Sequence, residues 1–281
     1  MFGGRRVEIK TPEQLLAMRR AGKVVAQALM ATTAEVRPGI TTGELDAIAA
    51  GVIASAGATP SFLNYGEEHG EGGFPGVICV SVNDEVVHGI PGDRVLREGD
   101  LVSIDCGAIV DGWHGDAARS VFVGQPATAE AAELCRVTHD ALWAGIGAAK
   151  LGGRVTDISA AIEGLVRSRD VDYGIAENLV GHGIGSQMHM EPNVPNEGKP
   201  GRGPRVVEGM ALAIEPMLTL GTPVTATLDD DWTMVTRDGS WACHWEHTIS
   251  VTADGLWVLT AEDGGAAMLE RLGLPFGPLA D

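Results

Sequence analysis

The chain has 281 residues, 44% of them hydrophobic, which is enough to bury the core of one large domain or two ordinary ones. Its 20 basic and 38 acidic residues give a formal net charge of −18, which opposes non-specific binding to DNA or anionic lipid. The apolar runs are short and broken by glycine or charge, so the sequence excludes a membrane-spanning segment.

Two helices followed by strands are predicted in the first part of the chain. Thr11 is expected to cap a long helix that begins at Pro12 and ends before Pro38, and Thr42 is expected to cap a second helix that reaches about residue 56. Alternating apolar side chains then predict strands at residues 77–82, 101–110 and 118–123.

The same order returns in the second part of the chain. Residues 127–149 are rich in helix formers, and residues 156–167 place apolar side chains on one helical face. Strands are predicted at 209–220, 233–237, 245–251 and 256–259, and an appended helix and tail at 262–281. The repeated order, with a faint likeness between residues 38–46 and 152–158, indicates two related halves.

The cysteines and the N-terminal residues indicate the cellular compartment. No two cysteines form a C-x-x-C pair, which argues against a structural zinc knuckle, and each lies in an apolar or strand-like stretch typical of a reduced, buried thiol. Arg5 and Arg6 are not followed by an apolar core, so we expect no signal peptide. The cytoplasm is therefore the expected location.

Two aspartates fall on the strands of one predicted hairpin. Asp105 interrupts an apolar strand, and a turn at residues 110–112 leads to a partner strand that carries Asp116. Depending on where the loop is centred, the two residues lie directly opposite or diagonally, and both registers place them on one face. Their repulsion can be relieved by a divalent metal, or by protonation or solvent exposure of one carboxylate, and the hairpin alone leaves these alternatives open.

Three later segments favour the metal. His182 lies between glycines in the sequence GHGIG, Glu215 ends an apolar strand, and Glu246 interrupts another strand with apolar neighbours. Buried carboxylates are costly unless paired or ligated, so one shared site with Asp105 and Asp116 is the simplest interpretation. Carboxylates with one imidazole suit Mn, Fe, Co or Zn, and a pair of ions at roughly 3.5–4 Å would lower the pKa of a bridging water.

Five motifs in this order resemble the type I methionine aminopeptidases. The likeness runs from about Val7 to about Thr260 and rests on NDEVVHGIP at 83–91, ID at 104–105 with HGD at 114–116, GHGIG at 181–185, IEP at 214–216 and EHT at 246–248. The resemblance implies the α+β pita-bread fold, a curved antiparallel β-sheet backed by helices, with two pseudo-twofold-related halves. It also implies one catalytic domain over residues 1–261 and a C-terminal extension over residues 262–281.

The resemblance implies a role for each metal-site residue. Asp105 is expected to chelate one of two divalent ions (Co, Mn, Fe or Zn), Asp116 and Glu246 to bridge both ions, and His182 and Glu215 to hold the other. Glu215 is also expected to shuttle protons for a metal-bridging hydroxide.

The resemblance further implies catalytic and substrate-binding side chains. His88 and His189 are expected to contact the substrate and the tetrahedral intermediate, as donors to a developing charge. The pocket for the methionine side chain is expected to be lined by Phe74, Cys79, Met188 and Trp232. The sequence departs from the family's usual aromatic residues at Glu71 and Met188 and from its usual tyrosine at Trp245, which leaves the shape of the pocket open.

The implied activity is hydrolysis of the N-terminal methionine from nascent polypeptides with a small second residue. The partners implied are nascent N-termini met at the ribosome, without DNA or a membrane, and the family indicates a monomer. One alternative is an X-Pro dipeptidase or aminopeptidase on the same fold, although such relatives usually carry a large additional N-terminal domain. A second alternative is a non-catalytic pita-bread binding protein, a class that loses metal ligands, whereas all five ligand positions are kept here.

Overall fold

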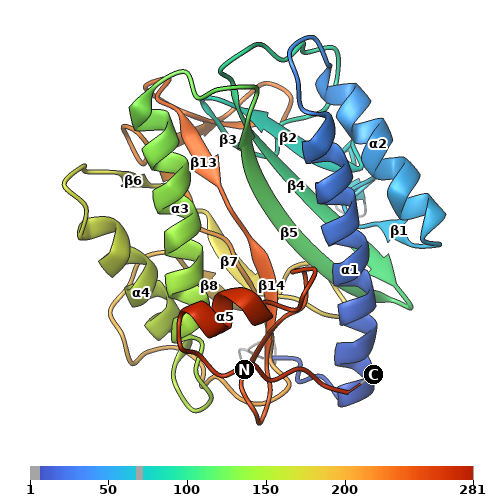
Figure 1. Ribbon diagram of the computed structural model, residues 1–281, viewed down its shortest axis with the longest axis vertical. Coiled ribbons are helices and arrows are strands. Elements are labelled where there is room, and N and C mark those ends of the chain that lie inside the picture. The colour runs from blue at the N-terminus through green and yellow to red at the C-terminus, as the bar shows by residue number, and fades with distance from the viewer. Residues whose placement is uncertain (1–6, 68–71, 281) are drawn as a thin grey trace.

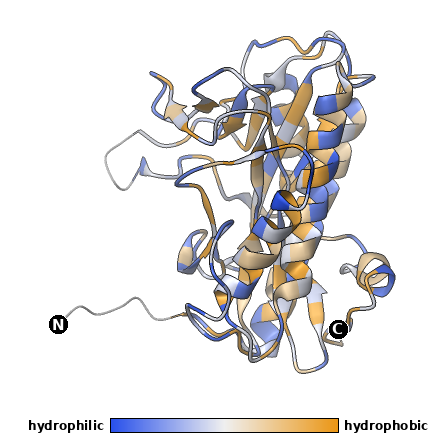
Figure 2. Ribbon diagram, turned by 90° about the vertical axis from the view of Figure 1, so that its left-hand side faces the viewer, coloured by the Kyte–Doolittle hydropathy of each residue, from blue (hydrophilic) through white to orange (hydrophobic). Residues whose placement is uncertain are grey.

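The computed structural model describes residues 7–67 and 72–280. Its four long helices cover one side of the strands, as two views at right angles show (Figures 1 and 2). The paired strands are all antiparallel, so the architecture is the predicted α+β arrangement of sheets backed by helices.

The first half consists of two helices and a sheet. Helix α1 (Pro12–Glu35) and helix α2 (Thr42–Ser55) both begin with capping boxes, in which a threonine accepts from the third backbone N–H and the third side chain accepts in return. The second cap is Thr41 rather than the predicted Thr42, because Glu44 pairs with Thr41. Behind these helices lies a sheet of β1 (Thr59–Pro60), β2 (Ile78–Val82), β4 (Leu101–Val110) and β5 (Trp113–Phe122).

The second half repeats this plan. Helices α3 (Ala129–Ala148) and α4 (Val155–Arg167) precede a sheet with the order β15-β14-β9-β7-β8. Its strands are β7 (Val180–Gly183), β8 (Met190–Pro195), β9 (Ala211–Ile214), β14 (His247–Val251) and β15 (Leu256–Val258). Two small sheets flank it, one of β6 (Gly174–Ile175), β10 (Met217–Thr219) and β13 (Ala242–His244), the other of β3 (Glu85–Val87), β11 (Thr225–Thr227) and β12 (Met234–Thr236).

Each helix pair packs on its own sheet. The apolar positions that predicted α1, namely Leu15, Met18, Val25 and Leu29, are all buried. One core cluster lies between α1, α2 and the first sheet, and a larger one lies between α3, α4 and the second. Gly22 of α1 allows close packing, because a Cβ there would lie 2.1 Å from the Leu259 carbonyl oxygen.

The two halves meet where β5 runs beside the start of β14. The Glu246 N–H donates to the Ala118 carbonyl at 3.0 Å, and the Thr248 hydroxyl donates to the Asp116 carbonyl at 2.8 Å. The Asp116 N–H in turn donates to the Thr248 hydroxyl at 3.1 Å. These backbone contacts hold Asp116 of the first half close to Glu246 of the second.

Two predicted strands are interrupted or shortened at a carboxylate of the site. The strand predicted at 209–220 is divided into β9 and β10 at Glu215 and Pro216, because proline has no N–H for the ladder. The strand predicted at 245–251 begins only at His247, so Glu246 lies in the connection between β13 and β14 rather than within a strand. His182, between its two glycines, lies on strand β7.

The last residues pack against the second half. Helix α5 (Ala266–Arg271) precedes a segment in which Gly277 donates to the Leu256 carbonyl and Leu256 donates to the Pro275 carbonyl, each at 3.0 Å. The buried Arg19 of α1 donates to the carbonyls of Leu259 and Glu262, each at 2.7 Å. None of the described helices is long and apolar enough to cross a bilayer. All four cysteines are free, and three are buried, whereas Cys135 is only partly buried on α3.

Candidate metal centre

All the side chains predicted to form the site line one cavity. It contains about 550 Å³ of empty space, part of it open to solvent, and is lined by Phe62, Tyr65, Phe74, Cys79, His88, Asp105, Asp116, His182, Met188, His189, Glu215, Trp232 and Glu246. Of these, Phe62 and Tyr65 are the two that the sequence did not predict. Both are aromatic residues that shortly precede Gly66, which adopts a positive φ. Aromatic residues just before a glycine are the only signal that the sequence offered for them.

The aspartate hairpin adopts the diagonal register. Asp105 on β4 pairs with Ala118, and Asp116 on β5 pairs with Gly107, so the two carboxylates are diagonal neighbours on one face. Glu215 is held at the break after β9, where the Asn196 side-chain amide donates to its carbonyl at 3.1 Å. The first half therefore contributes the aspartates, and the second half contributes His182, Glu215 and Glu246.

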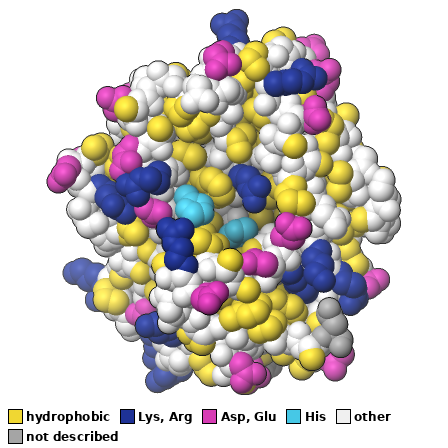
Figure 3. Space-filling model, viewed as in Figure 1, with side chains coloured by type: hydrophobic (Ala, Val, Ile, Leu, Met, Phe, Trp, Pro, Cys, Tyr) yellow, Lys and Arg dark blue, Asp and Glu magenta, His cyan; other side chains and the backbone are white. Residues whose placement is uncertain are grey.

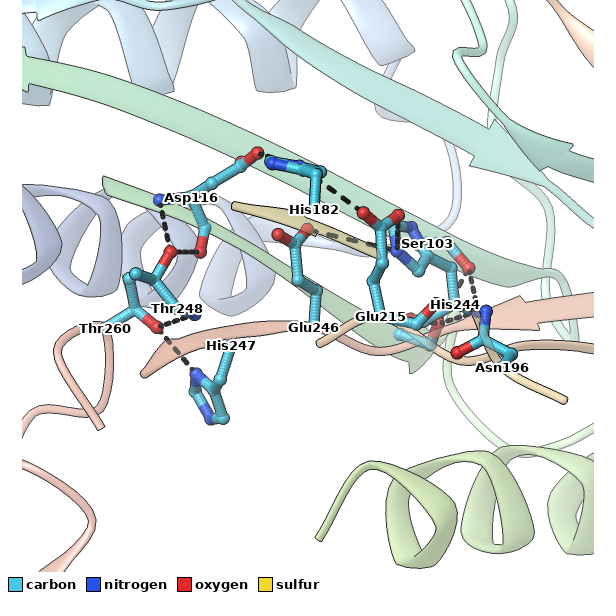
Figure 4. A network of polar contacts seen from close by, with 11 residues as sticks. Ser103, Asp116, His182, Asn196, Glu215, His244, Glu246, His247, Thr248 and Thr260 are labelled. Atoms are coloured by element: carbon cyan, nitrogen blue, oxygen red, sulfur yellow. Dashed lines mark hydrogen bonds and ion pairs between the residues drawn. The ribbon is translucent and has the colours of Figure 1, made fainter. Parts of the chain in front are cut away.

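Four of the five predicted ligand side chains, all except Asp105, converge in the groups described below (Figure 4). The Nε2 atom of His182 lies 3.4 Å from Glu215 Oε1 and 3.9 Å from Asp116 Oδ2. One group that could hold a metal ion consists of Asp116, His182 and Glu246, with ligand atoms within 4.8 Å of one another. A second such group consists of Glu215, His244 and Glu246, so Glu246 belongs to both.

The tautomer of His182 is set by its neighbour on the strand. Its Nδ1 lies 3.0 Å from the Gly183 carbonyl oxygen, which can only accept, so Nδ1 carries the proton. The Nε2 lone pair is therefore presented to the carboxylates. This is the arrangement in which a buried histidine binds a metal ion, with its second nitrogen held by a backbone carbonyl.

Burial makes the ionised carboxylates costly in the absence of a cation. It raises the pKa of Asp105 to about 7. Burial, and then the neighbouring negative charges, raise the pKa values of Asp116, Glu215 and Glu246 well above their ordinary range. Such perturbed pKa values gathered in one cavity are typical of a functional site.

The carboxylate atoms left without partners fit a bound cation. Asp105 Oδ1, Asp116 Oδ1 and Glu246 Oε1 are buried and have no hydrogen-bond partner among the described residues. Oxygen atoms that only accept, set beside imidazole nitrogen, are suited to divalent transition metals. A cation offsets both the repulsion and the missing hydrogen bonds, so the residues present fit a divalent metal centre.

Two further histidines lie at the rim of this centre. His88 has a positive φ of 60°, a strained conformation for a residue other than glycine, and burial lowers its pKa to about 4. The His189 ring lies edge-on to the His182 ring, with 4.4 Å between centroids, and its Nδ1 is hydrogen-bonded to the Tyr65 hydroxyl. Nε2 of His189 is thus its remaining polar atom.

An apolar pocket adjoins the carboxylates. Phe62, Phe74, Cys79 and Met188 form one buried cluster, and Trp232 packs edge-to-face on Phe74 with 5.3 Å between centroids. Burial raises the pKa of the Cys79 thiol well above its usual value, so this sulfur is a neutral part of the lining.

The positions that depart from the family pattern differ in where they lie. Met188 is in the pocket lining. Trp245 is not, because it faces the helix side of the sheet, where its ring lies 4.8 Å from that of His139. Glu71 lies outside the described residues.

A sheet backed by helices, with four buried carboxylates and histidine around an apolar pocket, defines a metal-dependent hydrolase. Residues 16–253 match metallopeptidase family M24. The chain is 53% identical to methionine aminopeptidase 1 of Mycobacterium tuberculosis over 263 residues, 92% of this chain and 96% of the relative. It is 45% identical to methionine aminopeptidase 1 of Bacillus subtilis, over 89% of this chain and 98% of that relative.

Solved structures agree with these matches. The crystal structure of methionine aminopeptidase from Thermotoga maritima superposes with a TM-score of 0.87 and 40% identity, over 92% of this chain and 100% of that one. Prolidase from Pyrococcus furiosus reaches a TM-score of 0.71 at 22% identity, over 90% of this chain and 65% of that one, which shows a shared fold alone. The chain belongs to metallopeptidase family M24 and, within it, to the type I methionine aminopeptidases with their pita-bread fold.

Proposed function

We propose that this protein removes the N-terminal methionine from polypeptides whose second residue is small. The observation that carries the proposal is the position of the buried carboxylate and histidine cluster beside a narrow apolar pocket lined by Phe74, Cys79 and Met188. An unbranched thioether suits this polarizable lining. A charged side chain would be buried there without a partner.

Two divalent ions, drawn from Co, Mn, Fe and Zn, are proposed as the cofactor. Asp105 would hold one ion, His182 and Glu215 the other, and Asp116 and Glu246 both. When bound, such ions lower the pKa of a coordinated water and polarise the scissile carbonyl. The four carboxylates carry the charge needed for two ions, and Glu246 belongs to both groups of converging ligand atoms.

Three side chains are proposed to handle protons and charge. Glu215 lies at the break after β9 with its carboxylate in the cavity, so it can accept a proton from water and return it to the leaving amine. His189, held at Nδ1 by Tyr65, can donate from Nε2 to the oxyanion of the tetrahedral intermediate. His88, strained at the cavity wall, is proposed to contact the substrate near the scissile bond.

The remaining proposals concern context. Residues 1–261 are proposed as the catalytic domain and residues 262–281 as an extension that packs on it through Leu256 and Thr252. Nascent chains that begin with methionine are the proposed substrates, so the protein is proposed to work in the cytoplasm at the ribosome. A monomer is proposed from the family. These proposals rest on the family and on the substrate chemistry.

The test is a panel of peptides assayed with the metal-reconstituted protein. We expect Met-Ala, Met-Gly and Met-Ser peptides to be cleaved, Met-Lys and Met-Phe peptides to be cleaved poorly, and norleucine to replace methionine at the first position. Lysine and glutamate at the first position should prevent cleavage. Preference for Ala-Pro over Met-Ala would instead identify an X-Pro peptidase, and equal kcat/KM for Met, Leu, Lys and Glu would refute the assignment of the pocket.

A further inference from the structure

His244 lies at the metal centre, although neither the sequence motifs nor the ligand set above includes it. It is the last residue of β13, and its side chain is 2% exposed. The Nε2 atom lies 3.7 Å from Glu215 Oε2 and 4.0 Å from Glu246 Oε2 (Figure 4). Among the described residues this buried nitrogen has no hydrogen-bond partner.

The backbone holds His244 firmly in this position. Its carbonyl accepts from the Ser120 hydroxyl at 2.7 Å. Its N–H lies 3.3 Å from the hydroxyls of both Ser103 and Ser120, which are hydrogen-bonded to each other at 2.7 Å. The ring therefore projects from a buried, fully bonded segment toward the carboxylates, and it is not a surface side chain folded inward.

The distances match those of the predicted histidine ligand. His182 Nε2 lies 3.4 Å and 3.9 Å from two carboxylate oxygens, and His244 Nε2 lies 3.7 Å and 4.0 Å from two others. The two His244 separations are too long for direct hydrogen bonds. They are, however, the spacings expected between atoms bound to one cation at about 2.0–2.2 Å.

We propose that His244 is an additional ligand to the ion assigned above to His182 and Glu215, which it would bind from the side of Glu215 and Glu246. The two groups of converging ligand atoms have the same composition, each with one imidazole and two carboxylates, and Glu246 is common to both. This inference rests on the divalent-metal centre of the proposed function. It adds that the Glu215 side of the centre favours ions with affinity for imidazole nitrogen, such as Co²⁺ and Zn²⁺, over Mn²⁺.

The first test is metal binding by the full-length protein, measured by isothermal titration with Co²⁺ and with Mn²⁺. In His244→Gln, the affinity of one ion should fall by at least the roughly 10–100-fold that the loss of an outer-shell partner costs, and the fall should be larger for Co²⁺ than for Mn²⁺. The control is His139→Gln, which removes a part-buried histidine on the other side of the sheet and should leave both affinities unchanged. Unchanged Co²⁺ affinity in a folded His244→Gln protein would overturn the inference and make His244 a structural residue.

The second test measures a new spectroscopic signal and not a loss of metal affinity. His244→Cys places a thiol where the ligand is proposed, and Cd²⁺ should then produce a new thiolate-to-metal ultraviolet band. The spectrum is recorded against the wild-type protein with Cd²⁺, so that any contribution from Cys79 is subtracted. Cd²⁺ binding without the new band would contradict ligation at this position, even if His244→Gln did not fold. If the wild-type protein itself binds no divalent ion, both this inference and the proposed function fail.

Discussion

Buried or partly buried histidines occur on both faces of the central strands, but their neighbours differ. On the helix side, a hollow is lined by Arg119, His139, Trp143, Trp245 and His247, among others (Figure 3). There, Trp143 Nε1 donates to His139 Nε2 at 3.2 Å, and His247 Nδ1 lies 2.9 Å from the Thr260 hydroxyl. On the other face, histidines lie among four carboxylates, and three of these, Asp105, Asp116 and Glu246, have a buried oxygen without a hydrogen-bond partner among the described residues.

Converging, largely buried carboxylates set beside an imidazole, and not histidines alone, determine where a cation can bind. Trp245 and His247 line the hollow, whereas Glu246 between them lines the cavity, because side chains alternate along an extended chain. In the described part of the chain, both groups of residues that could hold a metal ion lie on the cavity side. The carboxylates that line the hollow, Glu262 and Asp263, are exposed, and Arg119 supplies positive charge there.

The largest effect should follow from removing the metal or its shared ligand. Chelation is expected to abolish turnover of Met-Ala peptides, and Mn²⁺, Co²⁺ or Fe²⁺ should restore it. Asp116→Asn should lower kcat/KM by about 10³-fold or more and reduce the binding of both ions, because its carboxylate serves both. His139→Gln should retain metal content and activity, and full activity in exhaustively chelated protein would contradict the comparison.

A histidine of the cavity that is not a predicted ligand should affect the rate alone. His189→Ala is expected to lower kcat by about 10²-fold while metal content stays near that of the wild type, as for the loss of a transition-state donor. The measurement is steady-state kinetics with metal analysis of the same sample. An unchanged kcat would assign His189 to structure.

The two regions should respond to pH in opposite ways. The folded, metal-free protein holds protons on its carboxylates above their unfolded pKa values, 3.8 rising to about 7 for Asp105, so the free energy of unfolding should fall as pH rises through that window. Bound Mn²⁺ favours the ionised carboxylates and should remove this loss, so its effect on Tm should grow from about pH 5 to about pH 8.

The hollow provides the control for this pH effect. Burial lowers the pKa of His139 below its ordinary 6.5, so its contribution to stability should be lost as pH falls below that value, with or without metal. Thermal unfolding of wild-type and His139→Gln proteins across this range separates the two regions. A metal-induced shift in Tm that does not change with pH would contradict the carboxylate assignment.

The smallest effect is expected in the apolar pocket. Met188→Phe should change KM for methionine peptides by about tenfold or less and leave kcat nearly unaltered, because the pocket binds ground and transition states alike. Its matched control is Trp245→Phe on the other side of the sheet, which should leave KM unchanged. If kcat falls with Met188→Phe while KM stays constant, Met188 acts on the reacting groups and not on side-chain binding.

The sequence predicted most of this site because strand alternation determines which side chains share a face. Asp105 and Asp116 were placed on one face of the hairpin without knowledge of the loop, and the choice of the diagonal register required the structure. The same alternation, counted back from Glu246, would have placed His244 beside it. Phe62 and Tyr65 could not be placed, because their segment reaches the cavity through tertiary packing and not through a repeating pattern.

The predicted strands were wrong at two carboxylates of the site, which lie outside the regular hydrogen-bonded pairing of the strands. Glu215 and Glu246 both lie just outside regular strands, next to β9 and β14, although continuous strands were predicted through them. Pro216 makes the first break, and the second depends on Glu246 bonding across to Ala118 in the other half. That long-range contact has no signal in local sequence.

The contribution of ligands by both halves has a consequence for biosynthesis. Asp105 and Asp116 come from the first sheet, whereas Glu246 lies close to the end of the chain and completes both groups of ligand atoms. While the chain is still being made, its first half supplies aspartates but lacks the histidine and glutamate side chains of both groups. Metal loading is therefore expected to follow translation of residue 246, and a shortened product that ends before Glu246 is expected to bind metal weakly.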